Sequence, residues 1–270
     1  MSEPAVLYEK KDGIAFVTMN RPDVRNAINT EMLVRLADAW QDVNDDPAVH
    51  VAILRGAGDK AFCAGADLDR LVRMMQGLRP PETDFDQRVL NDYSIIYKGL
   101  LRNYQVTKVL IAAVRGFCVA GGTEILSTTD IRVAGDDARF GLAEVKWSLF
   151  PMGGSTVRLP RQISYCNAME ILLTGEQLSA ADALRMGLIN KVVPPDQVMA
   201  EARRYATIIA ANGPLAVQAV KRSVVVGLTL PPEQALEKEM EIGVPVSMSE
   251  DCREGTRAFR EKRKPVFKGR

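Results

Sequence analysis

Two acidic residues stand in or beside segments whose composition suits a binding site. Glu124 follows the segment GFCVAGG, residues 116–122, where apolar neighbours surround two adjacent glycines. Glu144 comes later, within ARFGLAEVKW. A buried glutamate needs a partner, so each acid taken alone is more typical of a solvated surface. Their pairing becomes informative only through the elements around them.

Two glycine-containing loops follow apolar strands. KAFCAGADL, residues 60–68, follows the strand expected over 49–55, and GFCVAGGTE, residues 116–124, follows the strand expected over 109–114. Such loops at neighbouring strand ends could aim two backbone N–H groups at one oxyanion. Glycine spacing alone favours the simpler interpretation that both are tight strand-to-helix connections. Neither loop matches the dinucleotide-binding or P-loop pattern.

Other kinds of chemistry have few residues to support them. His50 is the single histidine, so a histidine triad or a histidine-rich metal site is excluded by count. Cys63, Cys118, Cys166 and Cys252 are too scattered for a zinc motif and too few for a disulfide framework. We expect no metal, and proton transfer must use carboxylates, lysines, tyrosines or cysteines.

The composition is typical of a globular chain whose charges nearly cancel, so that it has no strong net electrostatic field. The 270 residues are 47% hydrophobic and carry a formal net charge of +1, which does not favour nucleic acid or membrane surfaces as partners. The longest apolar run, residues 109–114, is too short to cross a bilayer, and the first residues do not resemble a secretion signal. A cytoplasmic protein is the expectation.

The first elements are predicted from their patterns. Residues 5–20 form two β-rich runs joined at Asp12-Gly13, which predicts a hairpin. A helix is expected over 30–46 and a buried strand over 49–56. The helix places its apolar residues on one face: Met32, Leu33, Leu36, Trp40 and Val43.

The order of strand, glycine loop and helix then returns. Strands are expected over 109–114 and 130–135, which indicates an α/β fold, or α+β with a helical tail. Residues 70–105 look helical at both ends with a break at Pro80-Pro81, as in a pocket wall or lid. Residues 196–263 are helical in pattern, with breaks at Gly213-Pro214 and Pro231-Pro232.

Several segments together resemble the enoyl-CoA hydratase/isomerase, or crotonase, superfamily. They occur in that family's order and cover nearly the whole chain: RPDVRNAIN (21–29), FCAGADL (62–68), GFCVAGGTEILSTTDIRVA (116–134), ARFGLAEVKWSLFPMGGSTVRLPR (138–161) and ALRMGLINKVVP (183–194). The resemblance implies a spiral of β-β-α units. It divides the chain into a core domain, residues 1–195, with the acyl-CoA site, and a helical oligomerisation region, residues 196–270.

The resemblance also assigns catalytic roles. The N–H groups of Ala66 and Gly121 match the pair that holds the thioester carbonyl and stabilises the enolate. Glu124 matches the acid that activates water for addition to Cβ, and Glu144 matches the acid that delivers a proton to Cα. An apolar setting or the neighbouring carboxylate would keep Glu144 protonated, and the two acids would titrate as a coupled pair.

Coenzyme A is implied as part of the substrate, with no separate cofactor. The positions that match the family's CoA-binding segments are Arg25, Ala27, Lys60, Ala64, Gly65, Asp67 and Leu68. Phe259 and Lys262 match residues of a terminal helix that reaches the CoA of a neighbouring subunit, although a frayed basic tail is an alternative interpretation. Trimers, or hexamers made from two trimers, are implied.

The implied activity is reversible syn addition of water to a 2-enoyl-CoA thioester, as in fatty acid and lipid metabolism. The alternatives within the fold are a double-bond isomerase, a dehalogenase or a dehydratase of a hydroxyacyl-CoA such as carnitinyl-CoA. RNA binding is disfavoured, because the net charge is near neutral and only Phe259 and Phe267 are interleaved with the basic cluster. Glycoside hydrolysis is disfavoured, because only two tryptophans are present.

The chain departs from the family pattern at two places that concern the site. Ala120 stands where many relatives have a glycine, and residues 69–105 form a longer excursion than in short-chain hydratases. The excursion puts the length and identity of the acyl group in doubt. Tyr93, Tyr97 and Tyr104 could line the acyl pocket, but packing within the excursion is the favoured role.

Overall fold

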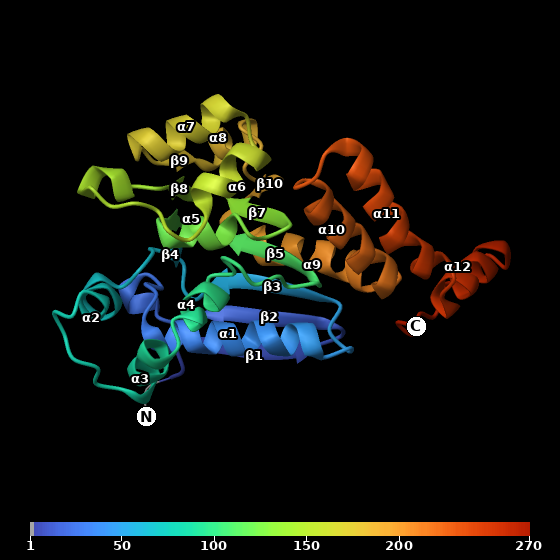
Figure 1. The fold of residues 1–270 in the computed structure, drawn as a ribbon, viewed down its shortest axis with the longest axis horizontal. Helices are drawn as coiled ribbons and strands as arrows, with labels where there is room; N and C mark the ends of the chain where they lie inside the picture. The colour runs from blue at the N-terminus through green and yellow to red at the C-terminus, as the bar shows by residue number, and fades with distance from the viewer. Residues whose placement is uncertain (1–2) are drawn as a thin grey trace.

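Two β-sheets form the centre of the molecule (Figure 1). The computed structural model describes residues 3–270. The larger sheet has the order β1-β2-β3-β5-β7-β10, with strands Val6–Lys11, Ile14–Met19, Val51–Gly56, Val109–Val114, Ile131–Gly135 and Lys191–Val193. The smaller sheet has the order β4-β6-β8-β9, with strands Ala61–Cys63, Phe117–Val119, Arg139–Gly141 and Leu178–Ser179.

Helices surround the sheets and form the C-terminal part of the chain. They are α1 (Thr30–Asp45), α2 (Arg73–Met75), α3 (Asp84–Asn91), α4 (Ser94–Gly99), α5 (Gly121–Leu126), α6 (Ser155–Gln162), α7 (Tyr165–Thr174), α8 (Ala180–Arg185), α9 (Val198–Ala210), α10 (Pro214–Gly227), α11 (Pro232–Ser247) and α12 (Glu250–Arg260). Short helical turns lie at Pro22–Val24, Leu68–Val72, Glu144–Trp147 and Pro195–Gln197.

The chain alternates between the two sheets, which confirms the expected spiral. β3 in the large sheet is followed by β4 in the small one, then β5 by β6 and β7 by β8. Within each sheet these successive strands pair in parallel. Because each turn of the spiral adds one strand to each sheet, the carboxyl ends of β4, β6 and β8 lie side by side.

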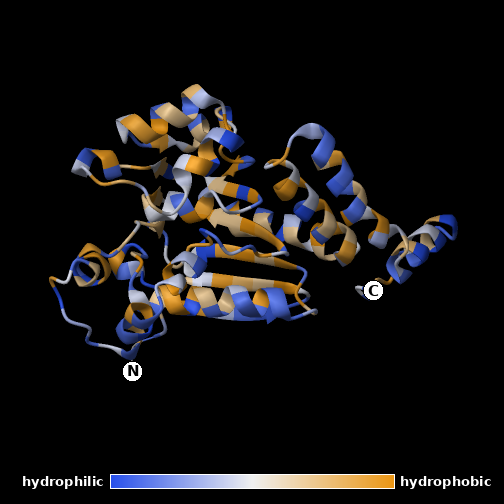
Figure 2. Cartoon of the chain, in the orientation of Figure 1, coloured by the Kyte–Doolittle hydropathy of each residue, from blue (hydrophilic) through white to orange (hydrophobic). Residues whose placement is uncertain are grey.

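The large sheet is buried on both faces, as expected for parallel strands. In β3, Ala52 and Leu54 pack toward α1 and the small sheet, whereas Val51 and Ile53 pack toward α9. This alternation follows from the period of two in a strand. Hydropathy colouring shows the same strands as a continuous apolar centre (Figure 2).

The opening hairpin and first helix are confirmed. β1 and β2 pair antiparallel, and Asp12 and Gly13 both have positive φ in the turn between them. The side chain of Asn29 accepts from Met32 N at the start of α1. The apolar residues predicted for one face of α1 are all fully buried, and the Trp40 indole donates to Gly99 O at 3.0 Å.

The excursion over 69–105 contains α2, α3 and α4 and is fastened to the core by one buried acid. Asp86 accepts from the Thr30 hydroxyl at 2.6 Å and from the N–H groups of Glu82 and Thr83 at 2.9 and 3.1 Å. Tyr104 packs against the core, as favoured, while Tyr93 is exposed. These contacts position α3 and α4 beside α1.

The C-terminal helices differ in how they are packed. α9 lies against the large sheet through Val198, Ala202 and Ala206. α10 and α11 form a hairpin that buries no residue, although Lys221 ties α10 to Asp130 at 2.7 Å. The predicted breaks before α10 and α11 are confirmed, and whether residues 196–270 act as an oligomerisation region stays a prediction.

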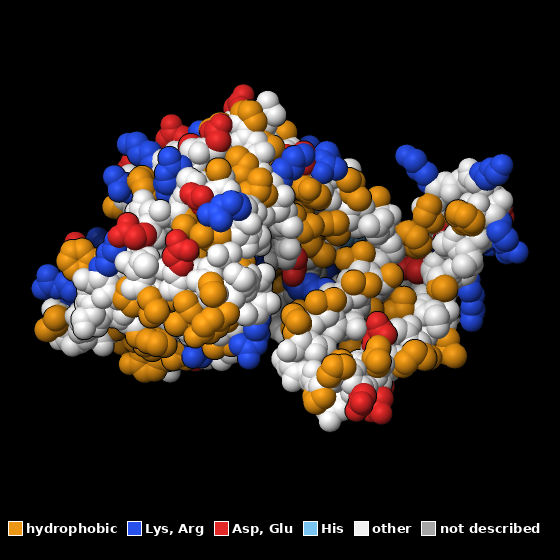
Figure 3. All heavy atoms as spheres, turned by 90° about the horizontal axis from the view of Figure 1, so that it is seen from above, with side chains coloured by type: hydrophobic (Ala, Val, Ile, Leu, Met, Phe, Trp, Pro, Cys, Tyr) orange, Lys and Arg blue, Asp and Glu red, His pale blue; other side chains and the backbone are white. Residues whose placement is uncertain are grey.

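Exposed apolar side chains gather along this hairpin (Figure 3). They are Val220, Val224, Leu228, Leu236, Met240, Val244 and Met248. The tail that follows α12 is held by Asp251, which accepts from the N–H groups of Lys268 and Gly269 at 2.7 and 2.8 Å. None of the helices in residues 3–270 is long and apolar enough for a membrane span.

The contacts of Asp86 lead to a prediction about the excursion. Asp86→Ala removes the acceptor of the buried Thr30 hydroxyl and of two N–H groups, and we expect it to lower the free energy of unfolding by about 1–3 kcal/mol. Hydrogen exchange should accelerate at residues 79–91. Asp84→Ala, at an exposed position of the same helix, is the control. Equal exchange in the two variants would contradict the fastening role.

Candidate active site

The residues expected to do chemistry follow three neighbouring strand ends. Ala66 follows β4, Gly121 and Glu124 follow β6, and Glu144 follows β8. These strands are adjacent and parallel in the small sheet, so their carboxyl ends open at one edge. The topology therefore brings together four residues from three segments that are far apart in the sequence.

Two backbone N–H groups lie unused at this edge. A Cβ atom placed on Gly121 would lie 3.7 Å from Ala66 N, and one placed on Gly65 would lie 3.2 Å from Gly121 N. Within residues 3–270, neither the Ala66 N–H nor the Gly121 N–H donates to a protein acceptor. Ala120 holds a φ of 49° just before Gly121, a conformation that costs a non-glycine residue energy. The two loops are thus in contact, with two free donors between them.

The loop that carries Ala66 is braced from both sides. Ile28 N donates to Gly65 O at 2.8 Å, and Asp67 N donates to Ile28 O at 2.9 Å. Arg21 also reaches across, donating to the Asp67 carboxylate at 2.8 Å. These bonds flank Ala66 without using its own N–H group, which leaves that donor free and fixed in place.

Glu124 is buried and well supplied with donors. Its Oε1 accepts from Gly153 N at 2.6 Å and from the Ser155 hydroxyl at 3.1 Å. Burial raises the pKa of the Glu124 carboxyl above its ordinary value, and the bonds from Ser155 and Gly153 and the charge of Arg158 offset only part of this rise. Because these donors stabilise the ionised form, they oppose the effect of burial.

Glu144 is half-buried and has fewer hydrogen-bond donors around its carboxyl group than Glu124. Its Oε2 is shielded from solvent and has no hydrogen-bond partner within residues 3–270. Burial raises the pKa of Glu144 to about 7, and the charge of Glu124 adds to this effect. Of the two causes expected from the sequence, burial therefore contributes more than the neighbouring carboxylate. The two acids share one region but experience different environments.

Most of the positions matched to CoA binding come together. Ala64 N donates to Arg25 O at 3.0 Å, which joins the 25–28 segment to the loop over 60–68. The Arg25 guanidinium lies 5.4 Å from the centroid of the Phe117 ring, and Phe117 N donates to Lys60 O. The Ala27 carbonyl accepts from Arg21, the residue that also holds Asp67.

The remaining matched positions are more exposed. Leu68 is 64% exposed at the end of the same loop. Phe259 is 86% exposed on α12, and Lys262 follows that helix, so a single chain does not bring this pair to the other positions (Figure 1). A role for Phe259 and Lys262 in binding therefore requires a second chain.

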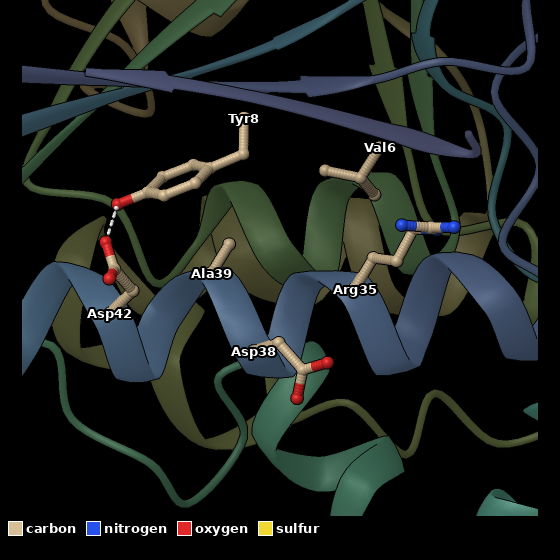
Figure 4. A pocket seen from close by; sticks show the side chains of 6 residues that line it. All are labelled: Val6, Tyr8, Arg35, Asp38, Ala39 and Asp42. Atoms are coloured by element: carbon tan, nitrogen blue, oxygen red, sulfur yellow. Dashed lines mark hydrogen bonds between the residues drawn. The ribbon is translucent and has the colours of Figure 1, made fainter. Parts of the chain in front are cut away.

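A separate groove lies between β1 and α1 (Figure 4), and neither Glu124 nor Glu144 lines it. It has a volume of about 310 Å³ and is lined by Val6, Tyr8, Arg35, Asp38, Ala39 and Asp42. Tyr8 points at Asp42 and donates to it at 2.6 Å, and Lys10 pairs with the same carboxylate at 2.8 Å. Tyr8, Lys10 and Asp42 are thus already partnered to one another, which indicates a structural role for this trio.

No group of three or more metal-ligating side chains suited to an ion occurs in the described part of the chain. Comparison with known proteins identifies the family of the chain. A model of the family described as enoyl-CoA hydratase/isomerase matches residues 9–270. The chain belongs to the enoyl-CoA hydratase/isomerase family.

Individual members of the enoyl-CoA hydratase/isomerase family match over nearly their full length. The enoyl-CoA hydratase EchA19 of Mycobacterium tuberculosis is 48% identical over 269 residues, covering 100% of this chain and 98% of the relative. The (E)-benzylidenesuccinyl-CoA hydratase of Thauera aromatica is 38% identical, covering 98% and 99%. The crystal structure of enoyl-CoA hydratase EchA1 from Mycobacterium marinum is 38% identical with a TM-score of 0.89, covering 99% and 100%.

Sequence reasoning missed the residues that control Glu124 in this enoyl-CoA hydratase/isomerase family member. Gly153, Ser155 and Arg158 all lie within MGGSTVRLP, a segment used only to support the resemblance. Its two glycines signal a turn, but only the tertiary structure shows that the turn faces Glu124. Arg21 was likewise not singled out, because its partner Asp67 lies 46 residues away.

The packing of Gly153 against Glu124 is testable. A Cβ at position 153 would lie 2.5 Å from Glu124 Oε2, so Gly153→Ala must displace the carboxylate or the loop. We expect a loss of about 1–3 kcal/mol in the free energy of unfolding. Denaturant unfolding measures this, with Gly243→Ala as control because a Cβ there meets nothing within 4 Å. Equal stability of both variants would refute the tight contact.

Proposed function

We propose that this protein is a 2-enoyl-CoA hydratase that adds water reversibly, with syn geometry, across the double bond of the thioester. The observation that supports this most strongly is the pair of acids, Glu124 and Glu144, in unlike environments beside two free N–H donors. One acid is suited to be ionised and the other to be protonated. Membership of the family and full-length similarity to named hydratases agree with it.

The thioester carbonyl would occupy the space between Ala66 N and Gly121 N. Both N–H groups would donate to its oxygen, which gains negative charge as the enolate forms. One such donor is typically worth a factor of about 10²–10³ in rate. Because side chains at these positions contribute nothing to the bond, small residues and a rigid backbone are what the site requires.

The two acids would act on the adjacent carbons. Ionised Glu124 would orient a water molecule and take its proton as the oxygen adds to Cβ. Protonated Glu144 would deliver its proton to Cα as the enolate collapses. Dehydration follows the same path in reverse. After hydration Glu124 is protonated and Glu144 is ionised. Proton exchange with solvent then restores the starting state of both.

Two acids also help to separate hydration from the alternatives within the fold. Isomerisation of a double bond moves one proton between carbons, which a single carboxyl group can accomplish. Addition of water needs a base for the water and an acid for Cα at the same time. Because both Glu124 and Glu144 lie at the site, hydration and its reverse are favoured, and analysis of the product from one substrate distinguishes them from isomerisation.

CoA would bind along the joined segments 25–28 and 60–68, with Arg25 and Lys60 as the positive groups. In this proposal CoA is part of the substrate, and no separate cofactor is used. The absence of nucleic-acid and membrane partners, and a cytoplasmic location, stay predictions from the sequence.

A homotrimer, alone or paired into a hexamer, would cover the apolar face of α10 and α11. That hairpin buries no residue in the single chain, although hydrophobic residues recur along it. Burying apolar area is worth roughly 25 cal/mol per Å², so assembly would stabilise the hairpin. Assembly would also allow Phe259 and Lys262 to approach the CoA of a neighbouring subunit.

The roles of the acids predict large, specific losses of activity. Glu124→Gln and Glu144→Gln should each lower kcat for hydration of a trans-2-enoyl-CoA by a factor of about 10²–10⁴, with little change in KM. Loss of the enoyl-thioester absorbance measures the rate. Glu170→Gln, an exposed acid on α7, should retain wild-type activity. Unchanged kcat in either site variant would exclude the assigned role.

The raised pKa of Glu144 predicts the pH dependence. As the acid, Glu144 must be protonated, so kcat/KM should fall as pH rises through about 7. As the base, Glu124 must be ionised, so kcat/KM should also fall at low pH, which gives a bell-shaped profile. Residual activity of Glu144→Gln should lack the high-pH decline. A decline that persists in this variant would assign it to another group.

The exposed hairpin predicts the effect of a charge on assembly. Met240→Asp should place a carboxylate in the proposed interface and shift the mass in solution toward the monomer. Light scattering coupled to gel filtration measures this mass. Gln234→Asp introduces the same charge at another exposed position of α11 and is expected to have less effect. A wild-type protein that is monomeric throughout would contradict the oligomer.

A further inference from the structure

Arg158 is connected to the Glu124 carboxylate through a single residue, Gly153, by the two peptide groups that flank its Cα. Gly153 N donates to Glu124 Oε1 at 2.6 Å, and Arg158 Nη1 donates to Gly153 O at 3.0 Å. Each bond restrains the orientation of the loop backbone from one side of Gly153. The position of the N–H that reaches Glu124 therefore depends on the position of the guanidinium.

The other end of the Arg158 guanidinium holds the end of the excursion. Its Nη2 donates to Leu101 O at 2.9 Å and to Arg102 O at 2.6 Å. Arg102 Nε returns the contact by donating to Met152 O at 2.7 Å. The loops at 101–102 and 152–153 are thus tied together in both directions, and the planar fork of an arginine suits several carbonyls at once.

The backbone around Arg158 leaves no room for another arrangement. Gly154 has a φ of 106°, and a Cβ on it would lie 2.2 Å from Arg158 Nη1. Gly153 is packed as closely against Glu124 on the other side. The glycine pair lets one loop contact the guanidinium and the carboxylate at the same time.

Few charged groups face Glu124. Glu144 repels it from the turn at Glu144–Trp147, while Arg158 attracts it from α6. Arg102 acts on Arg158, since its charge and the burial of Arg158 both lower the pKa of that guanidinium. On the strands beneath α5, burial raises the pKa of the Cys63 and Cys118 thiols, so both remain neutral. Arg158 is the cation in this set that favours ionised Glu124.

We propose that Arg158 is a positioning residue that keeps Glu124 ionised and aligned, through Gly153 and through its own charge. The proposal deepens the hydratase function and rests on it for the role of Glu124. As a consequence, the backbone at 101–102, at the end of the excursion, is linked through Arg158 and Gly153 to Glu124, the proposed general base. Arg158 itself has no contact with the proposed substrate position.

The test is to measure the protonation of Glu124 directly. Infrared difference spectroscopy over a pH series detects the protonated carboxyl band, which is assigned to Glu124 by its loss in Glu124→Gln. In Arg158→Gln the midpoint should rise by about half to one pH unit, because an attractive charge and an aligned donor are lost. The low-pH limb of kcat/KM should move in the same direction. Arg161→Gln, on the exposed side of α6, should change neither.

Arg158→Lys provides a second variant that retains the charge but not the fork. It should shift the midpoint less than Arg158→Gln while lowering kcat, because the single nitrogen of lysine does not reproduce the two separated nitrogens that hold the three carbonyls. An unshifted midpoint of Glu124 protonation in Arg158→Gln would overturn the proposal. If Arg158→Gln does not fold, Arg158→Lys decides, and a wild-type kcat together with a wild-type midpoint in that variant would overturn the proposal. A wild-type protein without hydratase activity would refute the proposed function instead. The infrared midpoint does not depend on activity, so it would still show whether Arg158 affects the protonation of Glu124.

Discussion

The proposed hydration requires two carboxyl groups in one partly buried space to hold different proton states. Neighbouring carboxylates in a low-dielectric setting repel each other, so they ionise together only at an energetic cost. Hydrogen bonds and a nearby cation at Glu124 oppose the effect of burial on its pKa, whereas Glu144 Oε2 has no partner among residues 3–270. In the proposed mechanism this asymmetry makes Glu124 the base and Glu144 the acid.

The spiral topology places the acids next to the oxyanion donors. Each turn contributes one short strand to the small sheet, and the loops after β4, β6 and β8 meet at one edge. The connection after β6 becomes α5, which carries Gly121 in its first turn and Glu124 one turn on. The proposed donor Gly121 and the proposed base Glu124 thus share one helix, while the proposed acid Glu144 and the second donor Ala66 come from the neighbouring loops.

Much of this could be predicted from the sequence because it is local or periodic. The hairpin, α1, the strands β3 and β5, and the breaks between the C-terminal helices all follow from turn residues and apolar spacing. The candidate residues followed from a resemblance. What could not be predicted is long-range: the Gly153 contact to Glu124 spans 29 residues and the Arg158 contact to Leu101 spans 57. No local pattern encodes such pairs.

The account depends most directly on where a thioester carbonyl binds. A crystal structure of the protein with acetoacetyl-CoA would locate that oxygen relative to the two strand-end loops. We predict hydrogen bonds from both Ala66 N and Gly121 N to the thioester oxygen, with Glu124 and Glu144 beside the adjacent carbons. A carbonyl bound elsewhere, or bound to only one of the two N–H groups with either acid turned away, would contradict the account.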